Sequence, residues 1–449
     1  MGSFRGRHIF VVGAGKSGFV SALRLVGEGG RLTLLDERPK EAVEQTLGQP
    51  IPPQIAFLQG RMSAKAAQGA DLVILSPGVP REKLPLEALS RAGTPVWGEL
   101  ELGYRLFRGK VAAVTGTNGK STVTTLLGEM AGRAFPRVFV GGNLGVPFVA
   151  AGGEEMDWAV VEASSFQLES IDTFRPKVAV LLNLTEDHRD RYPDFSSYAS
   201  AKMEIFRNQD AGDVAVLNGD DPEVAARAEA VRADKRWFSL SRSLDRGAFR
   251  SGDEILFRDG TEEEERYPCS LLRIRGVQNL ENALAAVASA RSMGIPAGTV
   301  RECLAAFPGL PHRVEFVRTV RGVSYVNDSK GTNVGAVQKC LEGFDEPVVL
   351  IAGGKDKGVD FRPLRDALSR KARAAVLIGE ARERMRREIA GAVPVHMAGT
   401  LEEAVRAAAE QARPGDAVVL SPACSSFDMF RSFEERGEAF REAVRGLPE

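Results

Sequence analysis

The chain has 449 residues, with 59 Lys and Arg against 60 Asp and Glu, and a formal net charge of -1. That balance excludes a broad basic footprint for nucleic acid or an anionic membrane. The 43% of hydrophobic and 27% of charged residues are typical of a globular protein rather than a disordered one. At about 150 residues per domain, the length predicts roughly three domains.

The cysteines and the first residues indicate a cellular compartment. No CxxC pair is present, which excludes a disulfide framework and a zinc knuckle. The first seven residues lead into an apolar strand without the apolar core of a secretory signal, and no apolar run has the length of a membrane span. We therefore expect a cytoplasmic protein with no membrane span. The four cysteines are Cys269, Cys303, Cys340 and Cys424.

Short apolar runs alternate with helical patterns from the start of the chain. Residues 8–12 and 31–35 lie one helix length apart, which predicts βαβ units and a parallel sheet. Residues 72–75 form a further strand that ends at Ser76-Pro77-Gly78. Open α/β sheets bind ligands at such carboxyl ends of strands.

Two more βα series follow, so the prediction is an α/β protein of three domains. A polar helix beginning at Glu99 and the Pro- and Gly-containing stretch 308–311 predict boundaries that divide the chain into residues 1–98, 99–309 and 310–449. Residues 254–260, followed by four glutamates at 262–265, predict an exposed hairpin with a solvated charge run. The strands of the two later series are residues 111–114, 158–161, 178–182, 347–351, 375–378 and 417–420.

The first glycine-rich motif is Gly13-Ala14-Gly15-Lys16-Ser17-Gly18, which follows the first strand and opens a helix. Asp36 ends the next strand. Glycines permit a tight turn, and the helix N-terminus then offers free N–H groups to a pyrophosphate. The motif is consistent with a dinucleotide site, with a site for another diphosphate ligand, or with a structural glycine turn.

The second motif, Gly116-Thr117-Asn118-Gly119-Lys120-Ser121, lies between an apolar strand and a helical stretch at 122–130. It provides a glycine-rich bend, a lysine for the β/γ-phosphates and a hydroxyl for Mg²⁺. Val114 stands where the longer P-loop pattern has a glycine, so the motif is a shortened P-loop.

The two motifs together favour an ATP-driven enzyme with a nucleotide-linked substrate. A nicotinamide oxidoreductase would use the first motif and leave the second without a role. Glu162 ends one strand after the P-loop, and His188 follows another, so both are expected near the phosphates. For His188 a purely structural role remains open.

A series of motifs resembles the Mur ligases, the ATP-dependent amino-acid ligases of peptidoglycan precursor synthesis, from about Ile9 to about Phe440. The resemblance implies an N-terminal Rossmann-like domain that binds the UDP end of the substrate, a central P-loop domain for ATP, and a C-terminal Rossmann-like domain for the amino acid. Besides the P-loop, the motifs are Gly141-Gly142-Asn143-Leu144-Gly145, Glu162-Ala163-Ser164-Ser165-Phe166-Gln167-Leu168, Asn183-Leu184-Thr185-Glu186-Asp187-His188, Tyr198 followed by Ala201-Lys202, and Pro311-His312-Arg313-Val314-Glu315.

Two further segments resemble the members of the family that add D-glutamate to UDP-N-acetylmuramoyl-L-alanine. They are residues 327–333, Asn-Asp-Ser-Lys-Gly-Thr-Asn, and residues 421–428, Ser-Pro-Ala-Cys-Ser-Ser-Phe-Asp, followed by Phe433-Glu434-Glu435-Arg436-Gly437. The reaction implied passes through an acyl phosphate and a tetrahedral intermediate and releases ADP and phosphate.

The resemblance also implies roles for individual residues. Catalysis is assigned to Lys120, Glu162, His188 and Lys202. Two Mg²⁺ sites are assigned to Ser121, Glu162, His188 and Lys202, with Lys202 carbamylated because an ammonium has no lone pair for a metal. ATP is assigned to Gly116, Thr117, Asn118, Gly119, Lys120, Ser121, Thr122, Asn282, Arg313 and Asp328.

The substrate positions follow in the same way. The UDP-linked substrate is assigned to Ser17, Gly18, Asp36, Arg38, Ser76, Asn143 and His188, while Glu37 stands where the family often has a small hydroxyl. D-Glutamate is assigned to Thr332, Lys357, Ser426 and Phe433. Lys357 is preferred over Lys355 for this role.

Other hypotheses stay open at this point. A folate polyglutamate ligase, or a Mur ligase for another amino acid, would share the central and last domains, although a folate ligase has no need of the first glycine motif. A nicotinamide oxidoreductase and a nucleotide-binding regulator without catalysis are the remaining alternatives. For the preferred enzyme we expect small-molecule substrates, ATP, Mg²⁺, no nucleic acid and a monomer.

Overall fold

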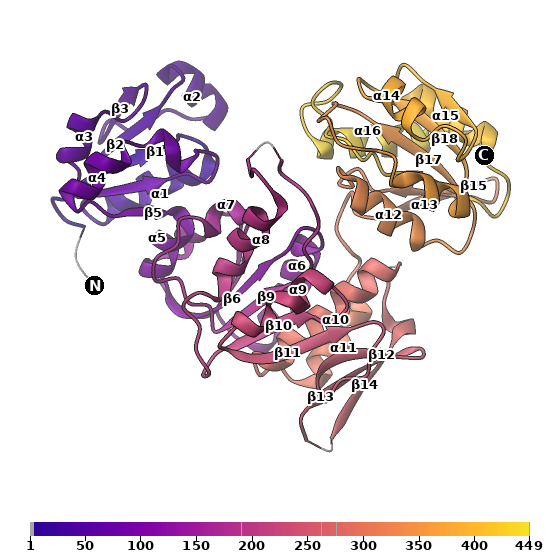
Figure 1. Cartoon of the computed structure of the whole chain (residues 1–449), viewed down its shortest axis with the longest axis horizontal. Helices are drawn as coiled ribbons and strands as arrows, with labels where there is room; N and C mark the ends of the chain where they lie inside the picture. The colour runs from indigo at the N-terminus through magenta and orange to yellow at the C-terminus, as the bar shows by residue number, and fades with distance from the viewer. Residues whose placement is uncertain (1–3, 190, 262, 275, 449) are drawn as a thin grey trace. The chain divides into compact units, whose positions relative to one another are not determined.

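The structure, a computed structural model, describes residues 4–189, 191–261, 263–274 and 276–448, and it contains three β-sheets with helices packed on them (Figure 1). The chain forms two compact units. The first unit comprises Met1–Tyr267 and Leu284–Cys303, and the second comprises Pro268–Ala283 and Leu304–Glu449. The first unit holds two of the sheets and the second holds the third. The predicted α/β fold in three domains is confirmed.

The N-terminal sheet has five parallel strands in the order β3-β2-β1-β4-β5. Successive side chains of a strand point to opposite faces, so Ile9 and Val11 pack with α1 on one face. Phe10 and Val12 pack with α3 and α4 on the other. The elements are β1 His8–Val12, α1 Lys16–Gly27, β2 Arg31–Asp36, α2 Lys40–Leu47, β3 Ile55–Gln59, α3 Ala64–Gln68, β4 Leu72–Leu75, α4 Leu86–Ala92, β5 Val96–Gly98 and α5 Glu99–Leu106.

The central sheet has nine strands in the order β14-β13-β12-β11-β10-β9-β6-β8-β7. Strand β6 lies between β8 and β9 and pairs in parallel with both, so the loops after these three strands meet at one edge. The elements are β6 Arg108–Thr115, α6 Lys120–Ala134, β7 Val138–Gly142, β8 Glu155–Glu162, α7 Ser165–Leu168, β9 Val178–Leu181, α8 Phe195–Met203, β10 Val214–Asn218, α9 Pro222–Arg227, β11 Asp234–Ser239, β12 Arg246–Ser251, β13 Glu254–Asp259, β14 Glu264–Pro268, α10 Val277–Ser292 and α11 Ala297–Ala306.

The exposed hairpin predicted at 254–260 is only partly correct. Strand β13 does form there, but Ile255, Leu256 and Phe257 are buried, because β13 lies between β12 and β14 in the central sheet. Glu263 is exposed, whereas Glu265 forms an ion pair with Arg291. Glu262 lies outside the described residues.

The third sheet, in the second unit, has the order β15-β16-β20-β17-β18-β19. Only the β15–β16 pair is antiparallel; the other pairs are parallel. No helix in the part of the chain that the structure describes is long and apolar enough to cross a membrane. The elements are β15 Glu315–Val320, β16 Val323–Asn327, α12 Val334–Glu342, β17 Val348–Gly353, α13 Leu364–Lys371, β18 Ala372–Ile378, α14 Arg382–Glu388, β19 Val395–Met397, α15 Leu401–Gln411, β20 Ala417–Leu420 and α16 Phe433–Arg445.

Candidate active site

The first glycine motif forms a tight loop between β1 and α1. Gly13 has a φ of +94°, a conformation that L side chains rarely adopt. A Cβ added at Gly18 would lie 1.9 Å from the carbonyl oxygen of Gly13. The Ser76 hydroxyl, from the loop after β4, donates to the same carbonyl oxygen at 2.6 Å. Glycine is therefore required at both positions for the backbone to turn this sharply.

A pocket of about 440 Å³ opens beside this loop. Its lining includes Ser17 and Ser76 from the N-terminal sheet, and Asn143 and Gln167 from the central one. Residues predicted to bind one substrate are thus brought together from two sheets of the same unit. The helix N-terminus of α1 lies on its wall, which suits an anionic group.

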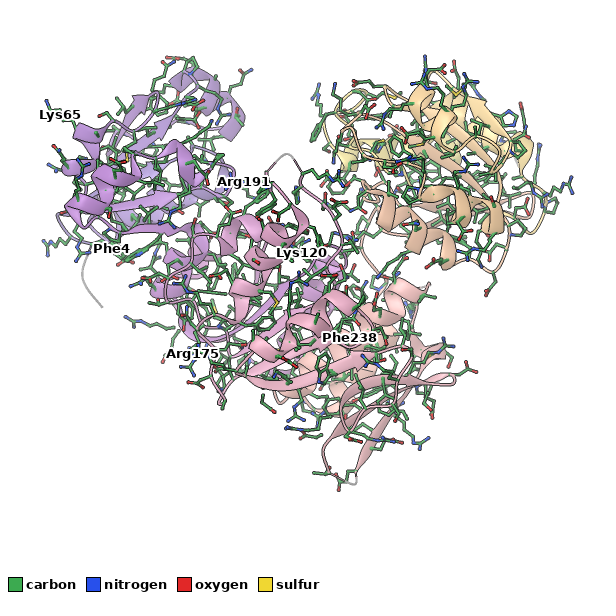
Figure 2. The ribbon with its side chains drawn as sticks, in the orientation of Figure 1. Phe4, Lys65, Lys120, Arg175, Arg191 and Phe238 are labelled. Carbon is green, nitrogen blue, oxygen red and sulfur yellow. The ribbon has the colours of Figure 1, made fainter. Side chains whose placement is uncertain are left out.

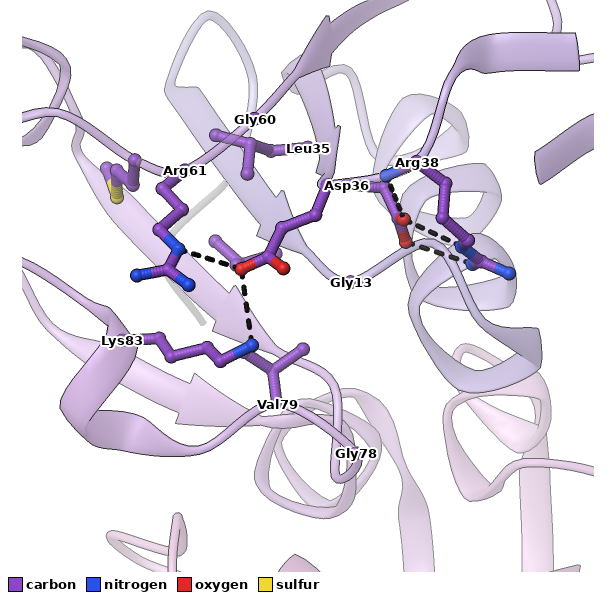
Figure 3. A pocket seen from close by; sticks show the side chains of 12 residues that line it. Gly13, Leu35, Asp36, Arg38, Gly60, Arg61, Gly78, Val79 and Lys83 are labelled. Atoms are coloured by element: carbon purple, nitrogen blue, oxygen red, sulfur yellow. Dashed lines mark hydrogen bonds and ion pairs between the residues drawn. The ribbon is translucent and has the colours of Figure 1, made fainter. Parts of the chain in front are cut away.

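Both oxygens of the Asp36 carboxylate, at the end of β2, accept hydrogen bonds from neighbouring groups of the protein. It accepts hydrogen bonds from the Ala14 amide and from the backbone and guanidinium of Arg38. Burial raises the pKa of Asp36, but the hydrogen bonds outweigh it and lower that pKa to about 2. Figure 3 shows Arg38 folded back onto Asp36. Both residues line the pocket and brace its loop as an internal pair.

A second, neighbouring pocket of about 280 Å³ shares Gly13, Asp36 and Arg38 with the first. Glu37 lines this pocket and forms ion pairs with two cations. Arg61 and Lys83 both bond Oε1 of Glu37, at 2.8 and 3.2 Å. These two contacts lower the pKa of Glu37, while its other oxygen, Oε2, accepts no hydrogen bond from the described residues.

The P-loop joins β6 to α6 in the central sheet. Gly116 and Gly119 have φ values of +150° and +87°, and Gly119 caps the helix that starts at Lys120 (Figure 2). The Lys120 ammonium donates to the carbonyl oxygens of Gly116 and Thr117, at 2.8 and 2.9 Å. These two bonds hold the Lys120 charge over the bend. The oxygens of a bound phosphate could accept the same protons in place of the carbonyl oxygens.

Lys202 on α8 points into the same bend. Its ammonium donates to the Gly116 carbonyl oxygen at 2.8 Å and lies 4.8 Å from the centre of the Tyr198 ring. The side chain is buried, with a relative exposure of 2%. Burial and the nearby Lys120 charge lower the pKa of Lys202 well below its usual value, and Asp187 and Glu162 oppose this only in part. Lys202 is therefore not an ordinary surface lysine.

Glu162, at the end of β8, is a buried carboxylate with one oxygen still available. Asn143 donates to its Oε1 at 2.7 Å, while Oε2 is buried with no hydrogen-bond partner among the described residues. An unsatisfied buried carboxylate oxygen is costly unless a cation or donor reaches it. Glu162 thus fits Mg²⁺, which prefers carboxylate and hydroxyl oxygens.

His188 occupies a strained position after β9. Its φ is +52°, and its ring lies 4.8 Å from the Phe166 ring and 6.1 Å from the Tyr198 ring, measured between centres. Strain of this kind at a non-glycine residue accumulates at functional sites. Within the described ranges no group of three or more His, Cys, Asp or Glu side chains is arranged to hold a metal ion. A metal here would depend on the Ser121 hydroxyl and on a modified Lys202 as well.

Two residues that hold the P-loop had no assigned role in the sequence-based site. The Tyr198 hydroxyl donates to Thr117 Oγ1 at 3.1 Å, and the Asn183 side chain bonds the backbone of Asn118 in both directions. The spacing of Tyr198, four residues before Lys202 on one helix, was the available signal, because such residues share a helix face.

Three predicted nucleotide-binding residues lie in the second unit: Asn282, Arg313 and Asp328. Asn282 on α10 is buried, and its amide donates to Asn279 Oδ1 at 3.3 Å. Asp328, just after β16, accepts from the Ser421 hydroxyl at 2.7 Å. Burial raises the pKa of Asp328 to about 6, against the opposing effects of Ser421 and Arg313.

The predicted D-glutamate positions lie on loops of the third sheet and at the start of α16. Ser426 is buried, and Phe433 packs under the Lys330 ammonium at 3.7 Å from its ring centre. Lys355 is bound to Glu380 at 2.6 Å, whereas Lys357 is exposed and forms no hydrogen bond or ion pair with a described residue. Thr332 is half-buried.

A buried network beneath these loops was not predicted. Arg436 has a relative exposure of 1% and donates to Ser329 Oγ and to the carbonyl oxygens of Ser329 and Cys424. The Ser329 hydroxyl donates in turn to the Phe433 carbonyl oxygen at 2.8 Å. Burial lowers the pKa of Arg436 to about 10, so it stays charged. The motif 433–437 places Arg436 beside two exposed glutamates, so the local sequence did not indicate that the arginine is buried.

Comparisons with known proteins show the family of the chain. Residues 7–98, 114–290 and 312–424 match the families described as Mur ligase MurD-like N-terminal domain, Mur ligase middle domain, and Mur ligase glutamate ligase domain. The UDP-N-acetylmuramoylalanine--D-glutamate ligase of Geobacter metallireducens is 47% identical over 444 residues, which are 98% of each chain. The protein of the same name from Geotalea uraniireducens is 45% identical over 98% of each chain.

The fold is also found in solved structures. A pseudomurein peptide ligase type C from Methanothermus fervidus aligns with a TM-score of 0.62 at 19% identity, covering 99% of this chain and 100% of that one. The family domains span most of the chain, and the named relatives match it over nearly its full length. The chain belongs to the Mur ligase family.

Proposed function

We propose that this chain is the ATP-dependent ligase that joins D-glutamate to UDP-N-acetylmuramoyl-L-alanine in peptidoglycan precursor synthesis. The observation that carries the proposal is the pair of ammoniums, Lys120 and Lys202, that share one P-loop carbonyl oxygen. Relatives named for this reaction match 98% of the chain at 47% and 45% identity. Neither a nicotinamide oxidoreductase nor a folate ligase would use both glycine-rich loops.

The three parts of the chain take different substrates in this proposal. Residues 1–98 bind the UDP end of the acceptor, residues 99–309 bind ATP, and residues 310–449 bind D-glutamate. The pocket beside the first glycine loop supports the first assignment, with Ser17, Ser76 and Asn143 on its wall. Lys357, exposed near the buried Ser426 loop, supports the third as the lysine available for a carboxylate.

ATP is bound by the P-loop of the first unit. The amides of residues 116–122 and the Lys120 ammonium hold the β- and γ-phosphates. The family resemblance also assigns Asn282, Arg313 and Asp328 of the second unit to the nucleotide. Tyr198 and Asn183 keep the bend in shape, since both bond it directly.

Two Mg²⁺ ions would be held by Ser121, Glu162, His188 and carbamylated Lys202. When bound, they supply positive charge to phosphate oxygens and to oxygens that become negative during the reaction. The lowered pKa of Lys202 favours its neutral amine. That amine adds to CO₂ and loses one proton, which replaces a cation with an anionic oxygen donor.

Amide formation requires activation because a carboxylate oxygen is a poor leaving group. The acceptor carboxylate takes the γ-phosphoryl group and becomes an acyl phosphate, with release of ADP. The amine of D-glutamate then attacks the carbonyl carbon, and the tetrahedral intermediate releases phosphate. Lys120 stabilises the charge that develops on the phosphoryl oxygens.

The test is a panel of amino acids with ATP, Mg²⁺ and the UDP-linked acceptor, followed by phosphate release. We expect phosphate only when D-glutamate and the acceptor are both present. Equal turnover with L-glutamate or L-lysine would contradict the D-glutamate assignment, and phosphate release without the acceptor would indicate a simple ATPase.

A further inference from the structure

The pocket of about 440 Å³ beside the first glycine loop has an unbalanced positive charge. Of the described residues that line it, three carry ionised side chains: Lys16, Asp36 and Arg38. Asp36 and Arg38 pair with each other through two side-chain hydrogen bonds, at 2.8 and 3.0 Å. Their charges cancel within the wall, so the net charge of the lining comes from Lys16.

Lys16 reaches across this pocket. It is the first residue of α1 and is exposed, and its ammonium donates to the Gly145 carbonyl oxygen at 2.7 Å. Gly145 belongs to the loop after β7 in the central sheet, 129 residues further along the chain, and it also lines the pocket. The bond therefore connects the two walls from which predicted substrate residues project.

The bond to Gly145 leaves most of the ammonium available. An ammonium has three N–H donors, and Lys16 bonds one neutral carbonyl oxygen and no carboxylate in the described chain. The cations of the neighbouring pocket differ, because Arg61 and Lys83 both bond the Glu37 carboxylate. Lys16 is thus the lining cation whose charge no anionic side chain balances.

The same wall carries the N-terminus of α1, whose backbone N–H groups are neutral donors suited to phosphate oxygens. Gly15 caps α1 without a side-chain hydrogen bond, and the first turn of that helix contains no acidic residue. Free N–H groups and the positive end of the helix dipole therefore point at the space beside Lys16. A diphosphate diester carries two negative charges. The helix N-terminus compensates part of this charge, and one cation beside it, Lys16, compensates a further part.

We propose that Lys16 is a binding residue for the diphosphate of the UDP-linked acceptor, and that it holds the Gly145 loop against that diphosphate. The identity of the acceptor rests on the proposed function; the charge and geometry of the site do not. The ammonium keeps its bond to Gly145 and donates its other protons to phosphate oxygens. Lys16 thereby contributes to recognition of the diphosphate and not to recognition of the uracil or the ribose.

The experiment measures UDP and uridine binding to the full chain by calorimetry. Lys16→Met removes the charge and keeps much of the side-chain volume, Lys16→Arg keeps the charge, and Lys65→Met removes an exposed lysine outside both pockets. We expect Lys16→Met to weaken UDP about 10- to 100-fold, the range for a hydrogen bond to a charged group. Uridine affinity should not change, and Lys16→Arg should recover most of the UDP affinity.

Salt dependence and kinetics provide second readouts. The UDP affinity of the wild type should fall with added salt more steeply than that of Lys16→Met. In turnover, Lys16→Met should raise the KM for the acceptor and leave the KM for ATP unchanged. Unchanged UDP binding by Lys16→Met, or equal losses for UDP and uridine, would overturn the inference while the ligase activity of the wild type still supports the proposed function. A wild type that binds UDP but does not ligate would instead reject the proposed function.

Discussion

Single residues of this protein have pKa values that only their surroundings explain. Lys202 and Lys120 approach the same carbonyl oxygen of Gly116, at 2.8 Å each. Two ammoniums so close repel each other, and burial adds to the cost of charging Lys202. The neutral amine is therefore favoured, which is the form that the proposed carbamylation requires. The charge of Glu162, whose Oε2 has no hydrogen-bond partner among the described residues, acts on this amine.

The first prediction concerns that amine. Lys202→Met should lower ligase turnover by at least about 100-fold, the range for removing a group that stabilises developing charge. The measurement is phosphate release, together with the carbamate signal in carbon-13 spectra after addition of labelled bicarbonate. Lys40→Met, at an exposed position of α2, should keep both. A wild type without a carbamate signal, yet fully active, would contradict the assigned role of Lys202.

The second prediction concerns Asp328, whose pKa in the fold is about 6 against an ordinary 3.8. Between these values the folded chain keeps a proton that the unfolded chain has lost. Stability from this residue is therefore present below about pH 4 and is lost as the pH rises through 6. The loss is on the order of 3 kcal/mol, since one pKa unit corresponds to about 1.4 kcal/mol.

The measurement for Asp328 is the melting temperature of the wild type and of Asp328→Asn between pH 4 and 8, without nucleotide. The wild type should lose stability relative to the variant across pH 4 to 6 and follow it in parallel above 7. A constant difference over the whole range would show that Asp328 does not titrate as described.

At the scale of elements, loops are held in place by buried polar groups. Arg436 on α16 bonds Ser329 in the loop after β16 and Cys424 in the loop after β20. None of its hydrogen bonds within the described residues goes to a carboxylate. The loops that carry Thr332 and Ser426 are therefore positioned by one guanidinium below them.

The third prediction follows from that network. Arg436→Met leaves three buried acceptors without their donor, each costing about 1–3 kcal/mol, so the melting temperature should fall. The KM for D-glutamate should rise more than the KM for the UDP-linked acceptor, because the loops affected carry the amino-acid site. Arg431→Met, at an exposed position in the preceding loop, is the matched control. Equal effects of the two variants would reject the positioning role.

At the scale of the whole molecule, the assigned ATP residues belong to two units. Lys120 lies in the first, while Asn282, Arg313 and Asp328 lie in the second. A ligand stabilises the part of the chain that it contacts. The nucleotide assignments can therefore be tested in each unit separately.

The fourth prediction uses hydrogen exchange. A non-hydrolysable ATP analogue with Mg²⁺ should protect peptides around residues 116–122 in the first unit and around 313–328 in the second. Lys120→Met should remove the protection around residues 116–122, because its ammonium is the assigned partner of the phosphates. Protection confined to the first unit would show that the second does not bind the nucleotide.

Much of the fold followed from the sequence. The strand at 8–12 matches β1, and the run at 417–420 matches β20, because short apolar runs between turn signals form the buried strands of parallel sheets. Boundaries were less accurate: the helical stretch predicted at 122–130 is longer in the structure, where α6 runs from Lys120 to Ala134. The burial of β13 was missed because it depends on side chains from distant parts of the chain, such as Arg291 of α10, which lies over the Phe257 ring.

By itself, the sequence determined the α/β class, the two glycine-rich loops and the chemistry that a P-loop implies, because these depend on local order and residue type. Only the tertiary structure decided that Asp36 is saturated by Arg38, that Lys202 shares a carbonyl oxygen with Lys120, and that Lys16 spans the pocket to Gly145. Hydrogen-bond partners and desolvation come from segments far apart in the chain. No local pattern encodes which donor reaches a given acceptor.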